Sequence, residues 1–323
     1  LLGPARHHKG DGPARERRQR ALRFRKQAAQ GADERQQVHF GRVGYPAQHQ
    51  QQGAVLRQAQ ALAQGGLVLR CGQRRRQQLC VQPQGHAANA CPRHVRQAIA
   101  RALAKEGAKV LVAGRKEEPL KALAEEIGGA YATADITRFE EVRALADKAV
   151  IAFGGVHIAV NATGWGLMAP LLETTEAQID QLMDLQFKGP YFFLQAFCAA
   201  MAARGEGGSL IQISSASTIA LLQNHAAYIG TKAGADALVR CFANEFGKHG
   251  IKVNSIAPGL TASPMTEQAM AAPGLEAAFA KEYPLGRIGT SQDIANACVW
   301  LGADESFITG ELLKVDGGWD MAG

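Results

Sequence analysis

The sequence contains no apolar run as long as a membrane span, and its start has no hydrophobic segment typical of a signal peptide. Its six cysteines, at positions 71, 80, 91, 198, 241 and 298, lack the Cys-x-x-Cys spacing of a zinc site and form no disulfide framework. The last three fall in apolar helical patterns, where reduced core cysteines are common. These absences predict a soluble, cytoplasmic protein with no metal site and no membrane partner.

Most of the chain lacks an excess of basic residues, although the net charge of the whole sequence is +7. Residues 1–96 carry 18 Lys and Arg against 4 Asp and Glu, whereas residues 97–323 carry 18 against 25. The second part is therefore acidic, and the overall charge does not predict that it binds nucleic acid.

The first 96 residues contain no Ile and no Met, and only 16 Leu, Val and Phe, against 17 Gln and 16 Arg. Such a composition is too poor in apolar residues to bury a core. It allows a disordered extension, a basic arm that binds nucleic acid or an acidic surface, or a segment read in a wrong frame. The start at Leu1 and the Arg, Gln, Ala and Gly bias, which GC-rich DNA gives out of frame, favour the third interpretation.

One stretch of the second part combines three residues that are suited to proton transfer. The apolar run at 210–213 ends in Ser214 and Ser215, as a buried strand would. Tyr228 and Lys232 follow in a helical apolar pattern at 226–249, where a spacing of four puts them on one helix face.

These residue types fit the interconversion of an alcohol and a ketone. A phenol has a pKa near 10, too high for a base at neutral pH, and a neighbouring ammonium group lowers that pKa. Ser215 could donate a hydrogen bond to the carbonyl oxygen. Because a Tyr-x-x-x-Lys pair alone is common on helices, the assignment depends on further motifs.

Several motifs in order resemble those of the short-chain dehydrogenase/reductase family. Ser215, Tyr228 and Lys232 have the spacing of its catalytic residues. Three further segments are similar to other signatures of the family: Asn161-Ala-Thr-Gly164, Asn254-Ser-Ile-Ala-Pro258-Gly259 and Val315-Asp-Gly-Gly318. The resemblance covers about residues 97–318, so we expect a catalytic domain at 97–323 and an extension at 1–96.

Strand and helix patterns alternate along this region. Strands are predicted at 109–113, 131–134, 157–160, 210–213, 252–256 and 312–315, and helices at 97–107, 139–153, 175–201, 226–249 and 291–301. This alternation predicts an α/β fold of the Rossmann type, a doubly wound parallel sheet that binds ligands beyond the carboxyl ends of its strands.

The resemblance implies NADP as the cofactor, with NAD the less favoured alternative. Gly114 stands where NAD-binding members have an acidic residue, and Arg115 could pair with a 2′-phosphate, unless it belongs to a solvated turn. The family pattern assigns Asp135 to the adenine, although it could also be a helix N-cap. The other implied cofactor contacts, some of which could be plain loop residues, are Asn161, Gly164, Tyr228, Lys232, Pro258, Gly259, Thr261 and Ser263.

Two departures from the family pattern stand out. Gln186 replaces an Asn that supports a proton-relay water, and its longer amide can still hydrogen-bond, so we keep it among the catalytic residues. The family's Thr-Gly-x-x-x-Gly-x-Gly loop should directly precede residue 97, but its motif positions hold Asn89, Ala90, His94 and Arg96. No apolar strand is evident before them, so we expect a first strand that is missing or replaced and no glycine cradle for phosphate.

The leading hypothesis is therefore an NADP-dependent oxidoreductase that interconverts a small carbonyl compound and an alcohol. The alternative is a catalytically inactive, frame-disrupted relative without the phosphate loop, and a third hypothesis is an interaction protein in which the basic arm matters most. The resemblance also implies a homodimer or homotetramer, joined through the helices predicted at 175–201 and 226–249. The sequence does not name the substrate.

Overall fold

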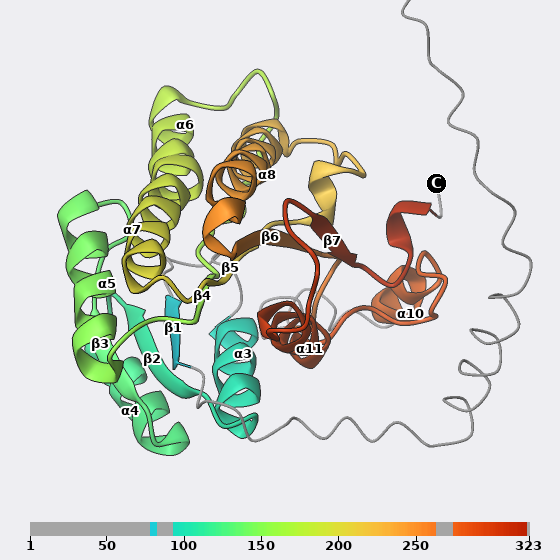
Figure 1. Cartoon of the computed structure of the whole chain (residues 1–323). Helices are drawn as coiled ribbons and strands as arrows, with labels where there is room; N and C mark the ends of the chain where they lie inside the picture. The colour runs from blue at the N-terminus through green and yellow to red at the C-terminus, as the bar shows by residue number, and fades with distance from the viewer. Residues whose placement is uncertain (1–77, 83–92, 263–273, 322–323) are drawn as a thin grey trace, which may run out of the picture. The chain divides into compact units, whose positions relative to one another are not determined.

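The computed structural model describes residues 78–82, 93–262 and 274–321, which belong to one compact unit, Gln73–Gly323. Its centre is a seven-stranded parallel sheet in the order β3-β2-β1-β4-β5-β6-β7 (Figure 1). The strands are β1 (Gln78–Gln82), β2 (Lys109–Gly114), β3 (Ala130–Thr133), β4 (Ile158–Asn161), β5 (Gly208–Ile213), β6 (Ile251–Pro258) and β7 (Leu312–Val315). The predicted α/β doubly wound fold is confirmed.

Helices cover both faces of this sheet (Figure 1). One face packs against α5 (Phe139–Phe153), α7 (Gly189–Arg204) and α8 (Ala226–Phe246), and the other against α3 (Arg93–Lys105), α4 (Glu117–Ile127) and α11 (Ser291–Gly302). Successive strand residues point to opposite faces, so Leu210 lies in the first core and Ile211 in the second. Each face buries apolar side chains, which is why most residues of the central strands are apolar.

The first strand is present, although we did not expect these residues to form it. β1 pairs in parallel with β2 and β4, and Cys80 lies opposite Leu111 and Ala159. Of the two expectations for the first strand, missing or replaced, the structure bears out the second, because a strand of different sequence fills the centre of the sheet. Only three apolar residues of Gln78-Leu-Cys-Val-Gln82 mark it, too few for a reliable period, while the inner edges of β2 and β4 require backbone partners.

The single helix predicted at 175–201 is interrupted. It consists of α6 (Glu176–Met183), a π-helical turn η1 (Asp184–Lys188) and α7. Gly189 follows the turn where an added Cβ would come within 3.0 Å of two Ile136 carbons, so close packing requires glycine there. π-helical turns inside helices are frequent at functional sites.

The remaining predicted elements lie within a few residues of their observed bounds, and α10 (Leu275–Ala280) is added after the loop that follows β6. Among the described helices, none is both long and apolar enough to cross a membrane. The interpretations offered for residues 1–77, and Ser263 among the predicted site residues, lie outside the described residues.

Candidate active site

The carboxyl ends of β4, β5 and β6 bring most of the predicted site residues to one edge of the sheet. Asn161 is the last residue of β4, Ser214 and Ser215 follow β5, and Gly259 and Thr261 follow β6. Adjacent parallel strands end side by side, so residues far apart in sequence meet here.

Helix α8 places Lys232 against two of these strand ends. Its side chain is only 3% exposed, and its Nζ donates to the carbonyl oxygens of Ile213 at 2.8 Å and Thr163 at 3.3 Å. Ile213 stands two residues before Ser215, and the half-buried Tyr228 lies one helical turn before Lys232. The chain therefore brings the ammonium group to the strand end that precedes Ser215.

Asn161 holds the loop that offers one of these carbonyls. Its Oδ1 accepts from the backbone N of Thr163 at 3.1 Å and from Thr163 Oγ1 at 2.7 Å. Its Nδ2 donates to Gln212 Oε1 at 2.8 Å, and Gln212 Nε2 donates to the Ile213 oxygen at 3.1 Å. A fully buried amide network thus joins β4 to β5, with the buried Gly164 directly after it.

Ser215 is positioned by the turn that follows β5. It precedes the 3₁₀-helix η2 (Ala216–Thr218), and its Oγ accepts from the backbone N of Ser217 at 3.3 Å. The Oγ atoms of Ser215 and Ser217 lie 2.8 Å apart, so they share a hydrogen bond. The half-buried hydroxyl is therefore held in a defined place at the strand end.

Sequence analysis missed a buried carboxylate, Asp236, which contacts the serine that directly precedes Ser215. Asp236, one turn after Lys232 on α8, accepts from Ser214 Oγ at 2.7 Å and from Ser255 Oγ at 2.8 Å. Burial raises the pKa of Asp236, and the two serine hydrogen bonds oppose that rise. The available signal was an acidic residue on the helix face that carries Lys232.

Gln186 lies in the π-helical turn η1 and is 1% exposed. Its Nε2 donates to the backbone oxygen of Trp165 at 2.5 Å, which fastens the loop after β4 to η1. The catalytic role given to Gln186 stays a prediction.

At the other end of the expected cofactor site, Gly114 ends β2 and the half-buried Arg115 follows it. Asp135 follows β3, and its Oδ1 accepts from the backbone N of Thr137 at 2.9 Å and from Thr137 Oγ1 at 2.8 Å. The N-cap of α5 is Arg138, so the alternative that Asp135 caps this helix is wrong.

The segment after β6 is fixed by close packing. A Cβ on Gly259 would lie 3.0 Å from Asp316 Cα and 3.2 Å from Tyr283 Cε1, so only glycine fits without a shift. Pro258, the last residue of β6, pairs with Val315 of β7. Thr261 is 8% exposed, and its Oγ1 donates to the Gly259 oxygen at 3.0 Å.

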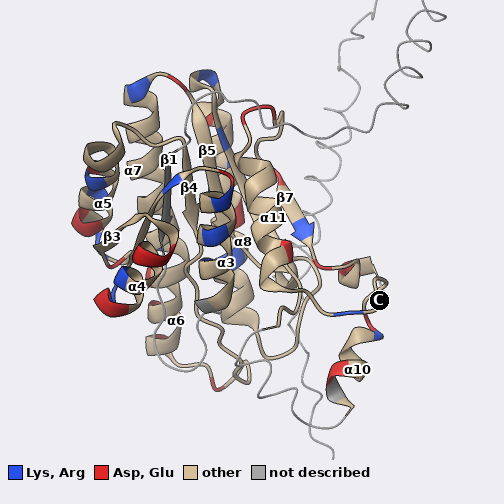
Figure 2. Ribbon diagram, turned by 90° about the horizontal axis from the view of Figure 1, so that it is seen from below, with Lys and Arg blue, Asp and Glu red and all other residues tan. Residues whose placement is uncertain are grey.

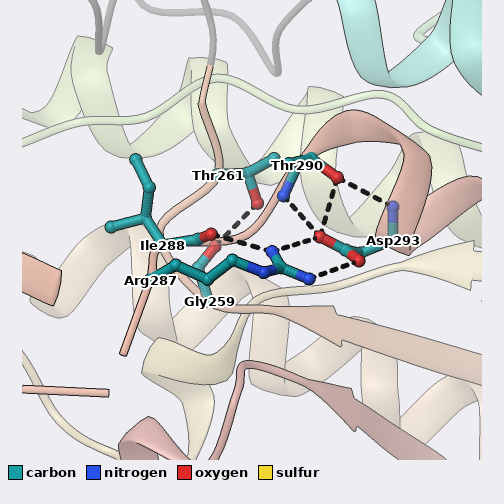
Figure 3. Close-up of polar contacts among 6 residues, drawn as sticks. All are labelled: Gly259, Thr261, Arg287, Ile288, Thr290 and Asp293. Carbon is teal, nitrogen blue, oxygen red and sulfur yellow. Dashed lines mark hydrogen bonds and ion pairs between the residues drawn. The ribbon is translucent and has the colours of Figure 1, made fainter. Parts of the chain in front are cut away.

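A second set of contacts holds the chain beside Thr261 (Figure 3). Arg287 donates to both carboxylate oxygens of Asp293, at 2.8 and 2.9 Å, and to the Ile288 oxygen at 3.0 Å. Thr290 and Asp293 form a capping box at the start of α11. The adjoining Gly289 forms a parallel bridge with Thr261, so this ion pair supports the position of the hydroxyl.

The described residues fit a nicotinamide cofactor better at the catalytic end than at the phosphate end. Lys232 and Thr261 offer an ammonium and a hydroxyl at one sheet edge, as a ribose and a carboxamide require, and Asn161 holds the Thr163 loop beside Lys232. The first turn of α3 instead carries the exposed His94 and the buried Arg96, without glycine. Among the described residues, no group of three or more His, Cys, Asp or Glu could hold a metal ion.

A doubly wound sheet with a Tyr-x-x-x-Lys helix against its strand ends is an arrangement typical of nicotinamide-dependent oxidoreductases. Residues 94–320 match a family model described as enoyl-(acyl carrier protein) reductase. The chain is 36% identical to a 2,5-dichloro-2,5-cyclohexadiene-1,4-diol dehydrogenase of Sphingobium indicum, a match that covers 67% of this chain and 89% of the relative.

Two further proteins agree with this match. An A-factor type gamma-butyrolactone 1′-reductase of Streptomyces virginiae is 36% identical, with 68% of this chain and 88% of the relative covered. The structure of a short-chain type dehydrogenase/reductase from Mycobacterium ulcerans is 29% identical, with a TM-score of 0.69 over 76% of this chain and 90% of that one. The chain belongs to the short-chain dehydrogenase/reductase family, whose members are oxidoreductases that use NAD or NADP.

Proposed function

We propose that the protein interconverts a small carbonyl compound and an alcohol with NADP, and that Ser215, Tyr228 and Lys232 form the reacting centre. The observation that carries this proposal is the buried Lys232 ammonium, one turn from Tyr228 and bonded to the strand end before Ser215. The alcohol and carbonyl chemistry in the names of the relatives supports it.

In the reductive direction, a carbonyl compound, NADPH and one proton give an alcohol and NADP⁺. The chemistry that the cofactor would supply when bound is a hydride for the carbonyl carbon. Tyr228 gives its phenolic proton to the carbonyl oxygen, and Ser215 donates a hydrogen bond that orients this oxygen. Lys232 lowers the pKa of Tyr228 and binds the ribose, while Gln186 supports the return of a proton to the phenol.

The proposed cofactor contacts run along the sheet edge. Arg115 pairs with the 2′-phosphate, and Asp135 meets the adenine amino group. The residues that would hold the ribose and nicotinamide are Asn161, Gly164, Tyr228, Lys232, Pro258, Gly259 and Thr261, and the family pattern adds Ser263, which lies outside the described residues.

A second candidate is an inactive member of the family. It is favoured by His94 and Arg96, whose side chains stand where bare backbone would bind phosphate at a helix N-terminus. It is weakened by β1, which completes the sheet beside the site. We therefore favour the active enzyme.

The proposed assembly is a cytoplasmic homodimer or homotetramer in which α7 and α8 meet a second copy. In Figure 2, α7 is almost entirely tan, whereas α4 and α5 carry both blue and red segments. Tyr191 on α7 is 40% exposed and packs edge-on against Phe242 of α8, with ring centroids 5.6 Å apart. An uncharged face with exposed aromatics is typical of a subunit interface.

The test of the proposed chemistry is Tyr228→Phe in the full chain. The substitution removes the proton donor, so carbonyl reduction at saturating NADPH should fall by roughly 100- to 10,000-fold, the scale of general acid–base catalysis. Circular dichroism should show an unchanged fold. A variant that retains a tenth or more of the wild-type turnover would refute the role of Tyr228.

A further inference from the structure

Two loops beside the proposed catalytic residues expose large apolar side chains. Residues 162–172 follow β4, and residues 216–224 follow β5 directly after Ser215. Together they form what we call the apolar rim: Met168, Leu171, Leu172, Ile219, Leu221 and Leu222. Leu172 is fully exposed and Leu221 is 76% exposed, so nothing else in the described chain covers them.

The two loops are joined to each other and to the site. The backbone N of Ala169 in the first loop donates to the Asn224 oxygen of the second at 2.8 Å. Gln186 fastens the first loop through Trp165, and Lys232 reaches its Thr163 oxygen. The two loops that carry the apolar rim are therefore fastened to the elements that hold Gln186 and Lys232.

Neither loop contains an Asp, Glu, Lys, Arg or His residue. The first ionisable residues after the two loops are Glu173 and His225, so the loops themselves offer no Lys or Arg to an anion. A carboxylate or phosphate would lose hydration against this surface without a compensating ion pair, whereas apolar substrate atoms would gain by burial.

We infer that the substrate is an uncharged and predominantly apolar carbonyl compound or alcohol, without a phosphate or carboxylate near its reacting group. This inference rests on the proposed function and adds the chemical class of the substrate. A rim that served to join two copies of the chain would instead be insensitive to substrate charge.

The test compares 2-octanone with the keto acid 7-oxooctanoate, which place the ketone at the same position in an eight-carbon chain and differ in a terminal carboxylate. We expect kcat/KM of the full chain to be about tenfold or more higher for 2-octanone, because the carboxylate must be desolvated. Equal or higher kcat/KM for the keto acid would overturn the inference.

The variant Leu221→Lys adds a cation to the apolar rim. It should raise kcat/KM for the keto acid, relative to that for 2-octanone, about two- to fivefold, the scale of one exposed ion pair. Ile151→Lys places the same charge at an 83% exposed site on α5 and should leave the ratio unchanged. The inference would also be overturned if Leu221→Lys left the ratio of the two kcat/KM values unchanged. It would be overturned as well if the variant changed only the oligomeric state, measured by light scattering.

Calorimetry with the two product alcohols, 2-octanol and 7-hydroxyoctanoate, separates this inference from the proposed function. If neither ketone is reduced but 2-octanol binds selectively, the proposed reaction is wrong and the substrate class stands. If both ketones are reduced without preference, the reaction stands and the substrate class is wrong.

Discussion

At the scale of single residues, the site depends on how buried polar groups are satisfied. Lys232 can be buried because two backbone carbonyls accept hydrogen bonds from its Nζ. Asn161 can be buried because its amide makes three hydrogen bonds, to Gln212 and Thr163. An unpaired polar group in the same place would cost about 1–3 kcal/mol, so each contact fixes the position of its residue. Because these contacts fix the side chains at the strand ends, substitution of a single residue tests the role of that residue.

Arg115 should determine the choice of cofactor. We expect a higher kcat/KM with NADPH than with NADH, and Arg115→Asp should shift this ratio roughly tenfold to a hundredfold toward NADH, because the carboxylate repels the 2′-phosphate. Lys116→Asp, at the exposed next position, makes the same charge change and should shift the ratio less. Equal efficiency with both cofactors in the wild type would disprove the assignment.

Asp236 should make the stability of the fold depend on pH. Burial raises its pKa in the native state, so between about pH 4, the ordinary value for Asp, and the raised pKa the native state binds more protons than the unfolded state. The free energy of unfolding of the wild type, relative to Asp236→Asn, should therefore fall as pH rises through that window. Urea unfolding of both proteins over a pH series measures this difference, and a flat or rising difference would show that burial does not control Asp236.

The residues of the site were predictable to different degrees. The positions of Ser215 after a strand and of Tyr228 and Lys232 on one helix were predictable because they follow from local patterns, whereas their chemistry stays a prediction. The sequence places Asp236 on the helix face of Lys232, but it did not predict the hydrogen bonds of Asp236, because an acidic residue in a helix gives no sign of whether it faces water or a buried serine. Its partners Ser214 and Ser255 come from two different strands.

At the scale of elements, the alternation of apolar strands and helices was sufficient to predict the layers of the fold. It did not predict the break at η1, because a single π-helical turn of five residues leaves the helical apolar pattern on either side intact. It also missed β1. This strand is defined by its pairing with β2 and β4, a tertiary contact that the sequence of five residues does not predict.

The apolar faces of α7 and α8 should hold the subunits together. We expect a dimer or tetramer at micromolar concentration by light scattering, and Tyr191→Asp should shift it toward monomer, because a buried carboxylate in the interface lacks a partner. Ile151→Asp on α5 serves as the control and should leave the mass unchanged. A monomeric wild type would contradict the proposed assembly.

At the scale of the whole molecule, the proposed catalytic residues are combined with a proposed cofactor site whose phosphate end lacks glycine in the first turn of α3. Each charge-assisted hydrogen bond to the pyrophosphate is worth about 1.5–3 kcal/mol, and His94 and Arg96 replace the bare backbone that would donate several of them. NADPH titrated into the full chain and followed by fluorescence should therefore bind poorly, without saturation at micromolar concentration. The double variant His94→Gly with Arg96→Gly should bind NADPH more tightly than the wild type. Micromolar binding of NADPH by the wild type would show that the chain builds the phosphate site in another way.

The central claim is that this chain passes a hydride between NADP and a carbonyl carbon at the Ser215, Tyr228 and Lys232 site. The most direct measurement incubates the full chain with a ketone and millimolar NADPH that carries deuterium at the transferring C4 position, and then determines the mass of the alcohol. The account predicts an alcohol heavier by one deuterium at the carbinol carbon with the wild type, and almost none with Tyr228→Phe. An unlabelled product, no alcohol at millimolar NADPH, or equal labelling by the variant would contradict it.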